Sequence, residues 1–178
     1  MGRSAPIIYT VGHSTHSFEE VVAILRAHGV ERLIDVRSIP RSRHNPQFNR
    51  ETLSKALHNR RINYRHMKAL GGLRHASPDS INVGWRNVSF RGFADYMQTP
   101  AFAKGLERLL ELAKQKATAI MCAEAVPWRC HRSLIADALI VRGCEVRDIM
   151  SVTDAKPHAL NPMAEVHGRQ VSYPEEAR

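Results

Sequence analysis

The sequence of 178 residues contains few cysteines and no long apolar run. Its three cysteines are too few for a disulfide framework, and their odd number is typical of a protein from a reducing compartment. No apolar run approaches the ~18 residues that a membrane-spanning helix needs, and residues 1–6 lack the apolar centre of a signal peptide. We therefore expect a cytoplasmic protein with no membrane association, whose thiols are available for chemistry or metal binding.

Cofactor fingerprints are also missing. No G-x-G-x-x-G follows the first predicted strand, and no Walker A sequence is present, so we expect no cofactor. Intrinsic disorder is excluded by the 43% content of hydrophobic residues. A chain of this length can bury roughly 70% of its unfolded surface and form one domain with a substantial core.

Acidic residues are scarce in one part of the chain. The net charge is +9, and the segment 37–91 alone carries a net charge of +10, with ten arginines and two lysines against Glu51 and Asp79. Arginine binds phosphate and carboxylate groups in a bidentate manner. This pattern predicts an anionic substrate, DNA or RNA being the obvious polymers, and the alternative is a solvated basic face. The sequence contains no signal for an oligomeric state.

Short β-rich runs alternate with helical periodicity. The pattern predicts strands over 7–11, 32–36, 62–66, 117–122 and 145–149, with helices beginning at 17, 50, 99 and 131 and a long loop over 68–90. This alternation indicates an α/β fold, a single Rossmann-like three-layer domain over 1–150 with a mostly parallel sheet of about five strands. Residues 151–178 contain three prolines and are predicted to form a C-terminal tail without a core of its own.

The predicted strand order is 3-2-1-4-5, which places the switch point between strands 1 and 4. Ligands bind at such a point, outside the carboxyl ends of the strands. The loops that meet there are 12–14, 35–37 and 122–124. His13 and Ser14 belong to the first of these loops, Asp35 and Arg37 to the second and Glu124 to the third.

The segment 121–139 predicts a strand, a loop and a helix. It places Cys130, His131, Arg132 and Ser133 around the helix N-terminus, where free amides and the macrodipole favour an anion and lower the pKa of a cysteine. A phosphate cradle and a thiolate site both fit this pattern. Cys130 is the better thiol candidate, since a cysteine such as Cys122 at the end of a buried strand is usually a small core residue.

A metal site is a further alternative for the same segment. The side chains of Cys122, Glu124, Cys130 and His131 could converge on an ion, although seven residues separate the two cysteines and fit no common zinc spacing. Whether a metal binds is left open at this stage.

The proline-bounded loop 38–46 carries exposed cations. Arg41, Arg43 and His44 cannot be buried there and can reach an external anion, and Asn45 accompanies them. Asp35, next to Arg37 at a strand end, is placed either for general base catalysis or for an ordinary salt bridge.

Several ordered motifs carry a resemblance to a known family. IYTVGHS, LIDVRSIPRSR with NPQFN, INYRHMKALGG, and MCAE followed by PWRCHR resemble the domain of unknown function 488 family over 7–149. The resemblance implies a Rossmann-like α/β fold and implies no reaction. The chain is more distantly similar to rhodanese-like domains, in which a DVR strand end precedes a cysteine loop and a helix. Here Pro127 and Trp128 lie among the extra residues between Cys122 and the helix.

Three functions fit these observations. The first is an enzyme that acts on a phosphate-bearing substrate, a nucleic acid or nucleotide, by hydrolysis or group transfer. The second is thiol-based sulfur transfer or redox chemistry through Cys130 or Cys122, and the third is a non-catalytic nucleic-acid-binding module. The candidate catalytic residues are His13, Asp35, Glu124, Cys130 and His131. The candidate substrate-binding residues are Ser14, Arg37, Arg41, Arg43, His44, Asn45, Tyr64, Arg132 and Ser133.

Overall fold

The computed structural model describes residues 6–175 and confirms the α/β class. The elements follow in the order β1 (Ile7–Gly12), α1 (Phe18–Ala27), β2 (Arg32–Asp35), α2 (Arg50–Asn59), β3 (Asn63–His66), α3 (Val88–Tyr96), α4 (Pro100–Gln115), β4 (Thr118–Cys122), α5 (Arg132–Val141), β5 (Glu145–Ile149), β6 (Ala155–Pro157), β7 (Glu165–His167) and β8 (Gln170–Ser172). Short 3-10 turns lie at Pro46–Phe48, Lys68–Leu70 and Pro127–Arg129. Within 6–175, no helix is long and apolar enough to cross a membrane.

The central sheet has six strands in the order β3-β2-β4-β1-β5-β6, and only β6 runs antiparallel to its neighbour. The expected order 3-2-1-4-5 is therefore wrong, because β4 lies between β2 and β1. Every residue of β4 is buried, as a strand paired on both edges and covered on both faces requires, whereas Ile7 and Tyr9 of β1 are partly accessible. The alternation of strands and helices along the sequence is the same for the expected and the observed strand order, so it cannot decide whether β4 or β1 lies next to β2.

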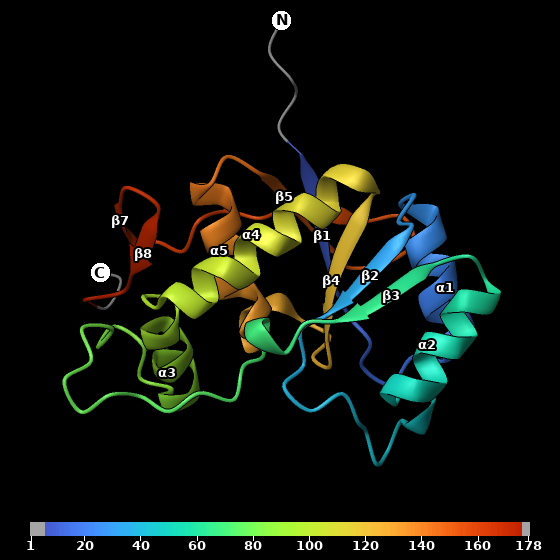
Figure 1. Ribbon diagram of the computed structural model, residues 1–178, viewed down its shortest axis with the longest axis horizontal. Coiled ribbons are helices and arrows are strands. Elements are labelled where there is room, and N and C mark those ends of the chain that lie inside the picture. Colours follow the sequence, from blue (N-terminus) through green and yellow to red (C-terminus); the bar gives the residue numbers. More distant parts are fainter. Residues whose placement is uncertain (1–5, 176–178) are drawn as a thin grey trace, which may run out of the picture.

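Helices cover both faces of the sheet, which makes three layers (Figure 1). On one face α1 and α2 pack against Leu33, Ala119 and Met121. On the other, α3, α4 and α5 pack against Ile8, Ile34 and Ile120. Neighbouring residues along each strand thus point into different cores, as the two-residue period of a strand requires.

Capping residues mark the N-termini of helices α1 and α4. Ser17 and Glu20 form the expected capping box at α1, and the Thr99 side chain accepts a hydrogen bond from the Phe102 amide at α4. The loop expected over 68–90 is shorter than predicted, because α3 begins at Val88. Gly92 in the middle of α3 weakens the helical sequence pattern. A Cβ at this position would lie 2.4 Å from the Arg74 carbonyl oxygen, so the close approach of the preceding loop requires the glycine.

The segment after Ser151 packs onto the main domain. Strand β6 extends the sheet, β7 and β8 form a separate hairpin, and Val171 and Tyr173 are buried in the core beside α5. His158 lies between two carboxylates of that domain. Its Nε2 is 2.9 Å from Asp137 Oδ1, and its Nδ1 is 2.9 Å from Asp148 Oδ2.

This contact predicts a specific pH dependence of stability. Burial by itself would lower the pKa of His158, but the two carboxylates outweigh it and raise the pKa to about 9. The stabilisation is therefore complete below the unfolded pKa of about 6.5 and is lost as the pH rises towards 9. We expect urea titrations to show roughly 1–3 kcal/mol of this loss in the wild type.

The matched variants are His158→Gln and His28→Gln. His158→Gln should be less stable at pH 6 and should lack the decline, since the imidazolium is gone. His28→Gln should keep the wild-type slope, because the His28 ring bonds the Ser151 carbonyl oxygen and no carboxylate. Equal slopes in all three proteins would contradict the assignment of the pH dependence to His158.

Candidate functional site

Three loops meet at the carboxyl edge of the sheet. The amides of His13 and Ser14 donate to the carbonyl oxygens of Cys122 and Ala123 at 3.0 and 2.9 Å, and the amide of Val36 donates to that of Met121 at 3.0 Å. The loop after β4 is therefore held between the loops after β1 and β2. The central position of β4 brings these loops together more directly than the expected strand order would.

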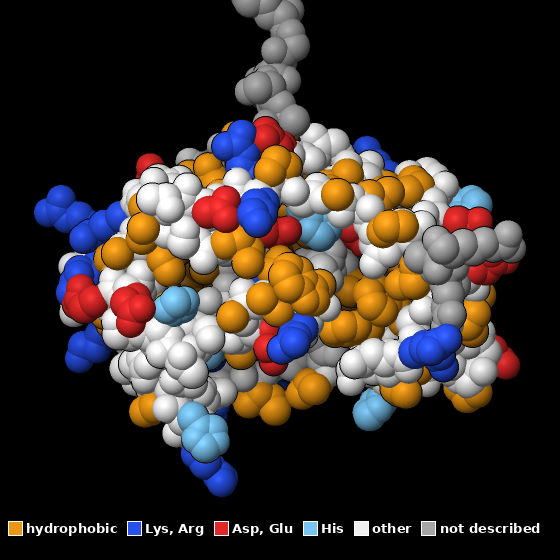
Figure 2. Space-filling model, turned by 180° about the vertical axis from the view of Figure 1, so that it is seen from behind, with side chains coloured by type: hydrophobic (Ala, Val, Ile, Leu, Met, Phe, Trp, Pro, Cys, Tyr) orange, Lys and Arg blue, Asp and Glu red, His pale blue; other side chains and the backbone are white. Residues whose placement is uncertain are grey.

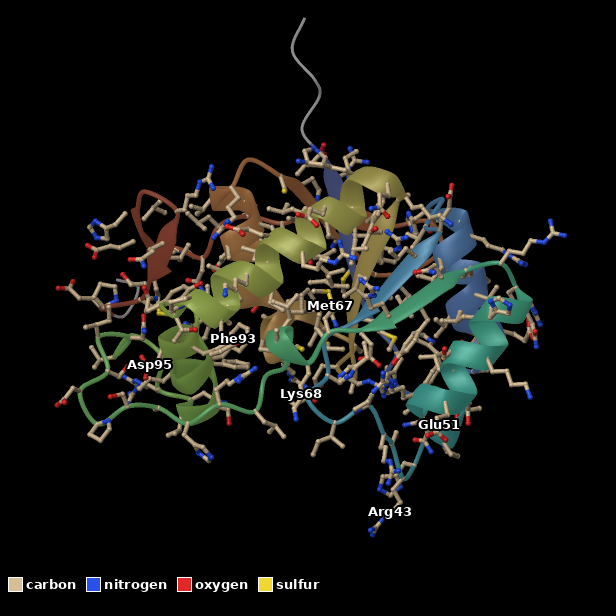
Figure 3. All side chains as sticks on the ribbon, in the orientation of Figure 1. Arg43, Glu51, Met67, Lys68, Phe93 and Asp95 are labelled. Atoms are coloured by element: carbon tan, nitrogen blue, oxygen red, sulfur yellow. The ribbon has the colours of Figure 1, made fainter. Side chains whose placement is uncertain are left out.

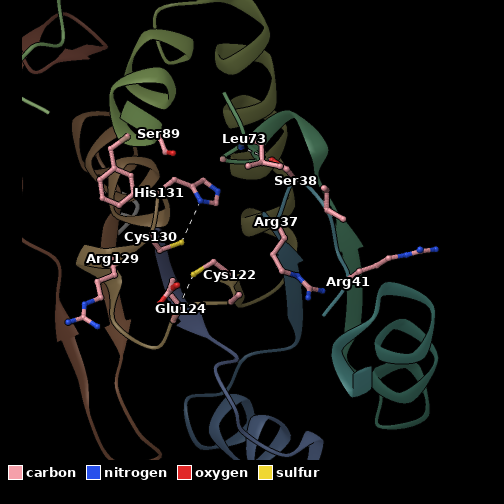
Figure 4. A pocket seen from close by; sticks show the side chains of 14 residues that line it. Arg37, Ser38, Arg41, Leu73, Ser89, Cys122, Glu124, Arg129, Cys130 and His131 are labelled. Atoms are coloured by element: carbon pink, nitrogen blue, oxygen red, sulfur yellow. Dashed lines mark hydrogen bonds between the residues drawn. The ribbon is translucent and has the colours of Figure 1, made fainter. Parts of the chain in front are cut away.

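A pocket of about 330 Å³ opens at this edge (Figure 4). Its walls come from the loops after β2 and β4, the loop before α3, and the start of α3 and α5. The lining residues are Arg37, Ser38, Ile39, Arg41, Gly72, Leu73, Ser89, Phe90, Cys122, Ala123, Glu124, Arg129, Cys130 and His131.

Arg132 lies beneath the pocket and is fully buried. Its Nη1 donates to Cys122 Sγ at 2.8 Å and to the Glu124 carbonyl oxygen at 2.6 Å, and its Nη2 donates to the Ala125 carbonyl oxygen at 3.2 Å. Among the described ion pairs, none provides this guanidinium with a carboxylate. Arg132 was expected to bind substrate, but its placement instead makes it a buried cation beside a thiol.

The loop over Arg132 explains the glycine that ends β1. A Cβ on Gly12 would lie 1.6 Å from the Glu124 carbonyl oxygen and 2.6 Å from Arg132 Nη1. The loop after β4 folds across β1 at this point, and only a residue without a side chain leaves space for it.

Cys122 is the thiol whose pKa this environment lowers. Burial by itself would raise its pKa, but interactions with Cys130 and with the positive charge of Arg132 outweigh burial and lower the pKa below its ordinary value. Cys130 was the thiolate candidate expected from the sequence, whereas the guanidinium of Arg132 contacts the sulfur of Cys122.

Cys130 keeps its proton. Burial and the neighbouring Cys122 raise the pKa of Cys130. Its Sγ lies 3.5 Å from the backbone nitrogen of Arg132 and 3.5 Å from Nδ1 of His131. In Figure 4 the sulfur atoms of Cys122 and Cys130 face the same part of the pocket.

His131 is held in one tautomer. Its Nε2 lies 2.9 Å from the carbonyl oxygen of Val36 and 3.0 Å from that of Leu70. Because carbonyl oxygens only accept, Nε2 carries the proton and Nδ1 faces the Cys130 thiol as an acceptor. Burial lowers the pKa of His131 to about 4, so the ring is neutral at physiological pH. Gly72 packs against this ring, where a Cβ would lie 2.6 Å from Nδ1.

Asp35, Arg37, His13 and Tyr64 form a second buried network. Asp35 accepts hydrogen bonds from Arg37 Nε at 2.9 Å, from Arg37 Nη2 at 2.7 Å and from the Tyr64 hydroxyl at 2.5 Å. Asp35 is fully buried and does not line the pocket, whereas Arg37 does. The arrangement is the salt bridge that the sequence left as the alternative to a general base.

His13 joins this network with both ring nitrogens occupied. Its Nδ1 lies 2.8 Å from the Ser14 carbonyl oxygen, and its Nε2 lies 3.3 Å from Arg37 Nη1. The ring stacks on Phe48, with 4.4 Å between centroids. Burial is the main cause of its lowered pKa, so His13 is a neutral packing partner of Arg37.

The remaining candidates lie at or outside the pocket mouth. Arg41 and Glu124 are exposed lining residues. Arg43 projects into solvent at the tip of its loop, away from the pocket (Figure 3), and His44 beside it is also exposed. Asn45 precedes the turn Pro46–Phe48.

The N-terminus of α5 offers no open anion cradle. The amides of Arg132, Ser133 and Leu134 donate to the Cys130 sulfur, the Cys130 carbonyl oxygen and the His131 carbonyl oxygen. The Ser133 hydroxyl also donates to the Cys130 carbonyl oxygen, at 2.9 Å. Over the described residues, no group of three or more His, Cys, Asp or Glu side chains could hold a metal ion.

Sequence reasoning missed several pocket residues. Leu73 comes from the long loop, and Ser89 and Phe90 come from α3, whose residues have no sustained helical periodicity. The pair Gly71 and Gly72 was the available signal, because adjacent glycines in a long loop often mark a close approach of backbone to another group.

One protein-family model matches the chain. The model for the domain of unknown function DUF488 matches residues 17–139. The chain belongs to the DUF488 family. The matched region includes Cys122, Cys130 and Arg132, and it leaves out β1 with Gly12. No curated protein and no solved structure matched the chain. The family name carries no activity, so the function of this DUF488 protein must be argued from its site.

The close packing at Gly12 gives a prediction for this DUF488 protein. Gly12→Ala should displace the loop after β4 and lower the free energy of unfolding by about 3 kcal/mol, as overpacking of a rigid site does. Gly105→Ala is the control, because a Cβ there lies in α4 and meets side-chain carbons at 3.1 Å and beyond. Its expected effect is within about 1 kcal/mol. Equal effects of the two substitutions in urea titrations would contradict the role of Gly12.

Proposed function

We propose that the protein is a thiol-dependent enzyme in which the Cys122 thiolate attacks an electrophilic centre of a small anionic substrate. The observation that carries this proposal is the 2.8 Å contact between Arg132 Nη1 and Cys122 Sγ at the base of the pocket. The contact joins a nucleophilic atom to a buried cation at the edge of the sheet where ligands of such folds bind.

The charge of Arg132 favours the thiolate. A buried cation without an anionic partner is strongly destabilising, because it loses its hydration and gains no ion pair. The carbonyl oxygens of Glu124 and Ala125 provide dipoles. Among the hydrogen-bond partners that the described residues give this guanidinium, the Cys122 sulfur is the group that can carry a full negative charge. Ionisation of Cys122 therefore relieves the unpaired charge of Arg132.

The other chemical groups at the edge have partners that reduce their reactivity. Asp35 accepts from Arg37 and Tyr64, and both ring nitrogens of His13 are engaged. The Nε2 proton of His131 is held by two carbonyl oxygens. This comparison favours the thiols over general base catalysis by a carboxylate or an imidazole.

The pocket mouth indicates the substrate class. Arg41 and Arg129 are exposed on opposite sides of the mouth, and Arg37 lies deeper, which favours a negatively charged group (Figure 4). Ile39 and Leu73 are 62% and 69% exposed on the same rim. A small molecule with one apolar part and one anionic group suits these surroundings.

The chemical step uses both thiols. The Cys122 thiolate forms a bond to the electrophilic atom, and the bond from that atom to the leaving group breaks, with its electron pair going to the leaving group. Cys130, whose pKa is raised, holds a proton beside this point and donates it to the leaving group. The reacting groups thus come from the end of β4 and from the residue two positions before α5.

Alkylation tests the proposal. The rate of iodoacetamide reaction at Cys122, mapped by mass spectrometry, should rise with pH along a curve whose midpoint lies below the free-cysteine value of about 8.5. The physical reason is the lowered pKa of Cys122. Cys130 and Cys144, whose pKa values burial raises, should react slowly across the same range.

The controls are Cys144→Ser and Arg132→Lys. Cys144→Ser should leave the curve unchanged, since Cys144 lies at the opposite end of the sheet, before β5. Arg132→Lys keeps a charge but loses the planar fork, so the midpoint should move towards that of free cysteine. A wild-type midpoint at or above 8.5 would remove the basis of the proposal.

Nucleic-acid binding is a second candidate, favoured by the exposed loop that carries Arg41, Arg43 and His44 next to the pocket. On the face of the molecule shown in Figure 2, the Lys and Arg side chains of the described residues are scattered among acidic and hydrophobic ones. The loop at the pocket edge is therefore the surface to test for a phosphate backbone.

Salt dependence checks this candidate. If Arg41 and Arg43 each neutralise a phosphate, the double variant Arg41→Ala, Arg43→Ala should reduce the slope of log K against log salt by roughly two. Lys114→Ala is the control, because Lys114 is exposed at the far end of α4 and should leave the slope unchanged. Absence of binding to single-stranded DNA or RNA in low salt would eliminate the candidate.

A further inference from the structure

We propose that Cys122 and Cys130 act as an attacking and a resolving thiol, and that the pocket accepts small disulfides that carry a negative charge. This inference rests on the proposed function, because it takes Cys122 as the attacking thiol. It adds the substrate class and gives Cys130 a bond-forming role beyond the donation of a proton.

The geometry of Arg132 connects the two sulfur atoms. Its Nη1 donates to Cys122 Sγ at 2.8 Å, and its backbone nitrogen lies 3.5 Å from Cys130 Sγ. Both cysteines line the same pocket, although only 2% of Cys122 and 6% of Cys130 is exposed. Their side chains face each other in Figure 4. The two thiols thus contact one residue, Arg132, and line one small pocket.

The third cysteine has no part in this arrangement. Cys144 is buried at the start of β5, and Glu145 of that strand pairs with Ile7 at the beginning of β1. Cys122 pairs with Gly12 at the opposite end of β1. The parallel sheet therefore separates Cys144 from the pair by the length of a strand.

The Cys130 thiol is kept from ionising by burial and by the neighbouring Cys122, which raise its pKa, and the adjacent imidazole of His131 is a poor acceptor of its proton. Nδ1 of that ring faces Cys130 Sγ and is a weak base, with a pKa lowered to about 4 by burial. Cys130 therefore stays protonated while Cys122 is a thiolate, and it becomes nucleophilic only after the negative charge on Cys122 has been consumed. This order of events is what an attacking and a resolving thiol require.

The reaction balances without a cofactor. The Cys122 thiolate attacks one sulfur of a disulfide R–S–S–R′, a Cys122–S–S–R bond forms, and R′S⁻ leaves with the electron pair of the broken bond. Cys130 gives its proton to R′S⁻, attacks the Cys122 sulfur and expels RS⁻, which takes a proton from solvent. The substrate is reduced to two thiols, and the protein is oxidised to a Cys122–Cys130 disulfide. A small dithiol then reduces that disulfide by the same exchange.

Loss of the thiolate makes this disulfide easy to reduce. Oxidation leaves the buried guanidinium of Arg132 without its anionic partner, and reduction restores it. Stabilisation of a reduced thiolate is the feature that makes a disulfide strongly oxidising. The pair is therefore suited to turnover and not to a permanent crosslink.

The test uses 5,5′-dithiobis(2-nitrobenzoate), an aromatic disulfide with carboxylates that suits the apolar rim and the arginines. All proteins carry Cys144→Ser. With Cys122 and Cys130 intact, we expect two thionitrobenzoate ions released per chain, no retained adduct by mass spectrometry, and a disulfide between the two cysteines that dithiothreitol reverses. Cys130→Ser and Cys130→Ala should each release one ion and retain one thionitrobenzoate group on Cys122. Cys122→Ser should show no rapid release.

The possible failures are distinguishable. Retention of an adduct on Cys122 with both thiols present would overturn the resolving role of Cys130 and leave Cys122 as a nucleophile. No rapid release from any protein would overturn the proposed function as well. The charge preference has its own control in cystamine, a cationic disulfide. Its rate, normalised to the reaction of each reagent with glutathione, should be at least tenfold lower, and equal normalised rates would overturn the anionic substrate class.

Discussion

The guanidinium of Arg132 carries a positive charge into a space from which water is excluded, and the site is built around that charge. The carbonyl oxygens of Glu124 and Ala125 turn inward to accept its protons, which fixes the loop after β4. The same loop crosses β1 where Gly12 has no side chain. Cys122, at the end of the central strand, completes the shell with a sulfur atom at 2.8 Å. Gly12 and Arg132, which are 120 positions apart in the sequence, therefore both contribute to the burial of one positive charge.

Strand order decides which groups can meet that requirement. With β4 between β2 and β1, the end of β4 is bonded to both neighbouring loops. The Met121 carbonyl oxygen accepts from the amide of Val36 after β2, and the Cys122 and Ala123 carbonyl oxygens accept from the loop after β1. His131 adds a link from the residue before α5 to the carbonyl oxygens of Val36 and Leu70. The pocket walls are thus joined by buried hydrogen bonds, which is the rigidity that a preorganised site needs.

Much of this architecture could be predicted from sequence, and the failures have physical causes. Capping at Ser17 and Thr99, and the short apolar strand runs, are local signals, so five strands, four helices and their shared edge were predicted. Helix α3 and the short strands β6, β7 and β8 were not. Strand order was not, because every buried parallel strand has a similar pattern. The choice of Cys130 over Cys122 followed from proximity to a helix N-terminus. The structure adds a contact from the first residue of α5, Arg132, to the sulfur of Cys122, ten residues earlier in the sequence. A contact of this kind depends on how the loop folds, so no periodic sequence pattern predicts it.

Two arginines at this edge show how the partner determines the chemistry. Arg37 is paired with the Asp35 carboxylate at 2.7 Å, and this ion pair holds the loop after β2. Arg132 is paired with a thiol, which can be neutral, ionised or covalently occupied. Each change at the Cys122 sulfur therefore changes the free energy of a buried charge. In the proposed mechanism, a covalent adduct on Cys122 removes the counterion of Arg132 and is destabilised relative to the thiolate. The interaction that would activate Cys122 as a nucleophile would therefore also favour release of the adduct.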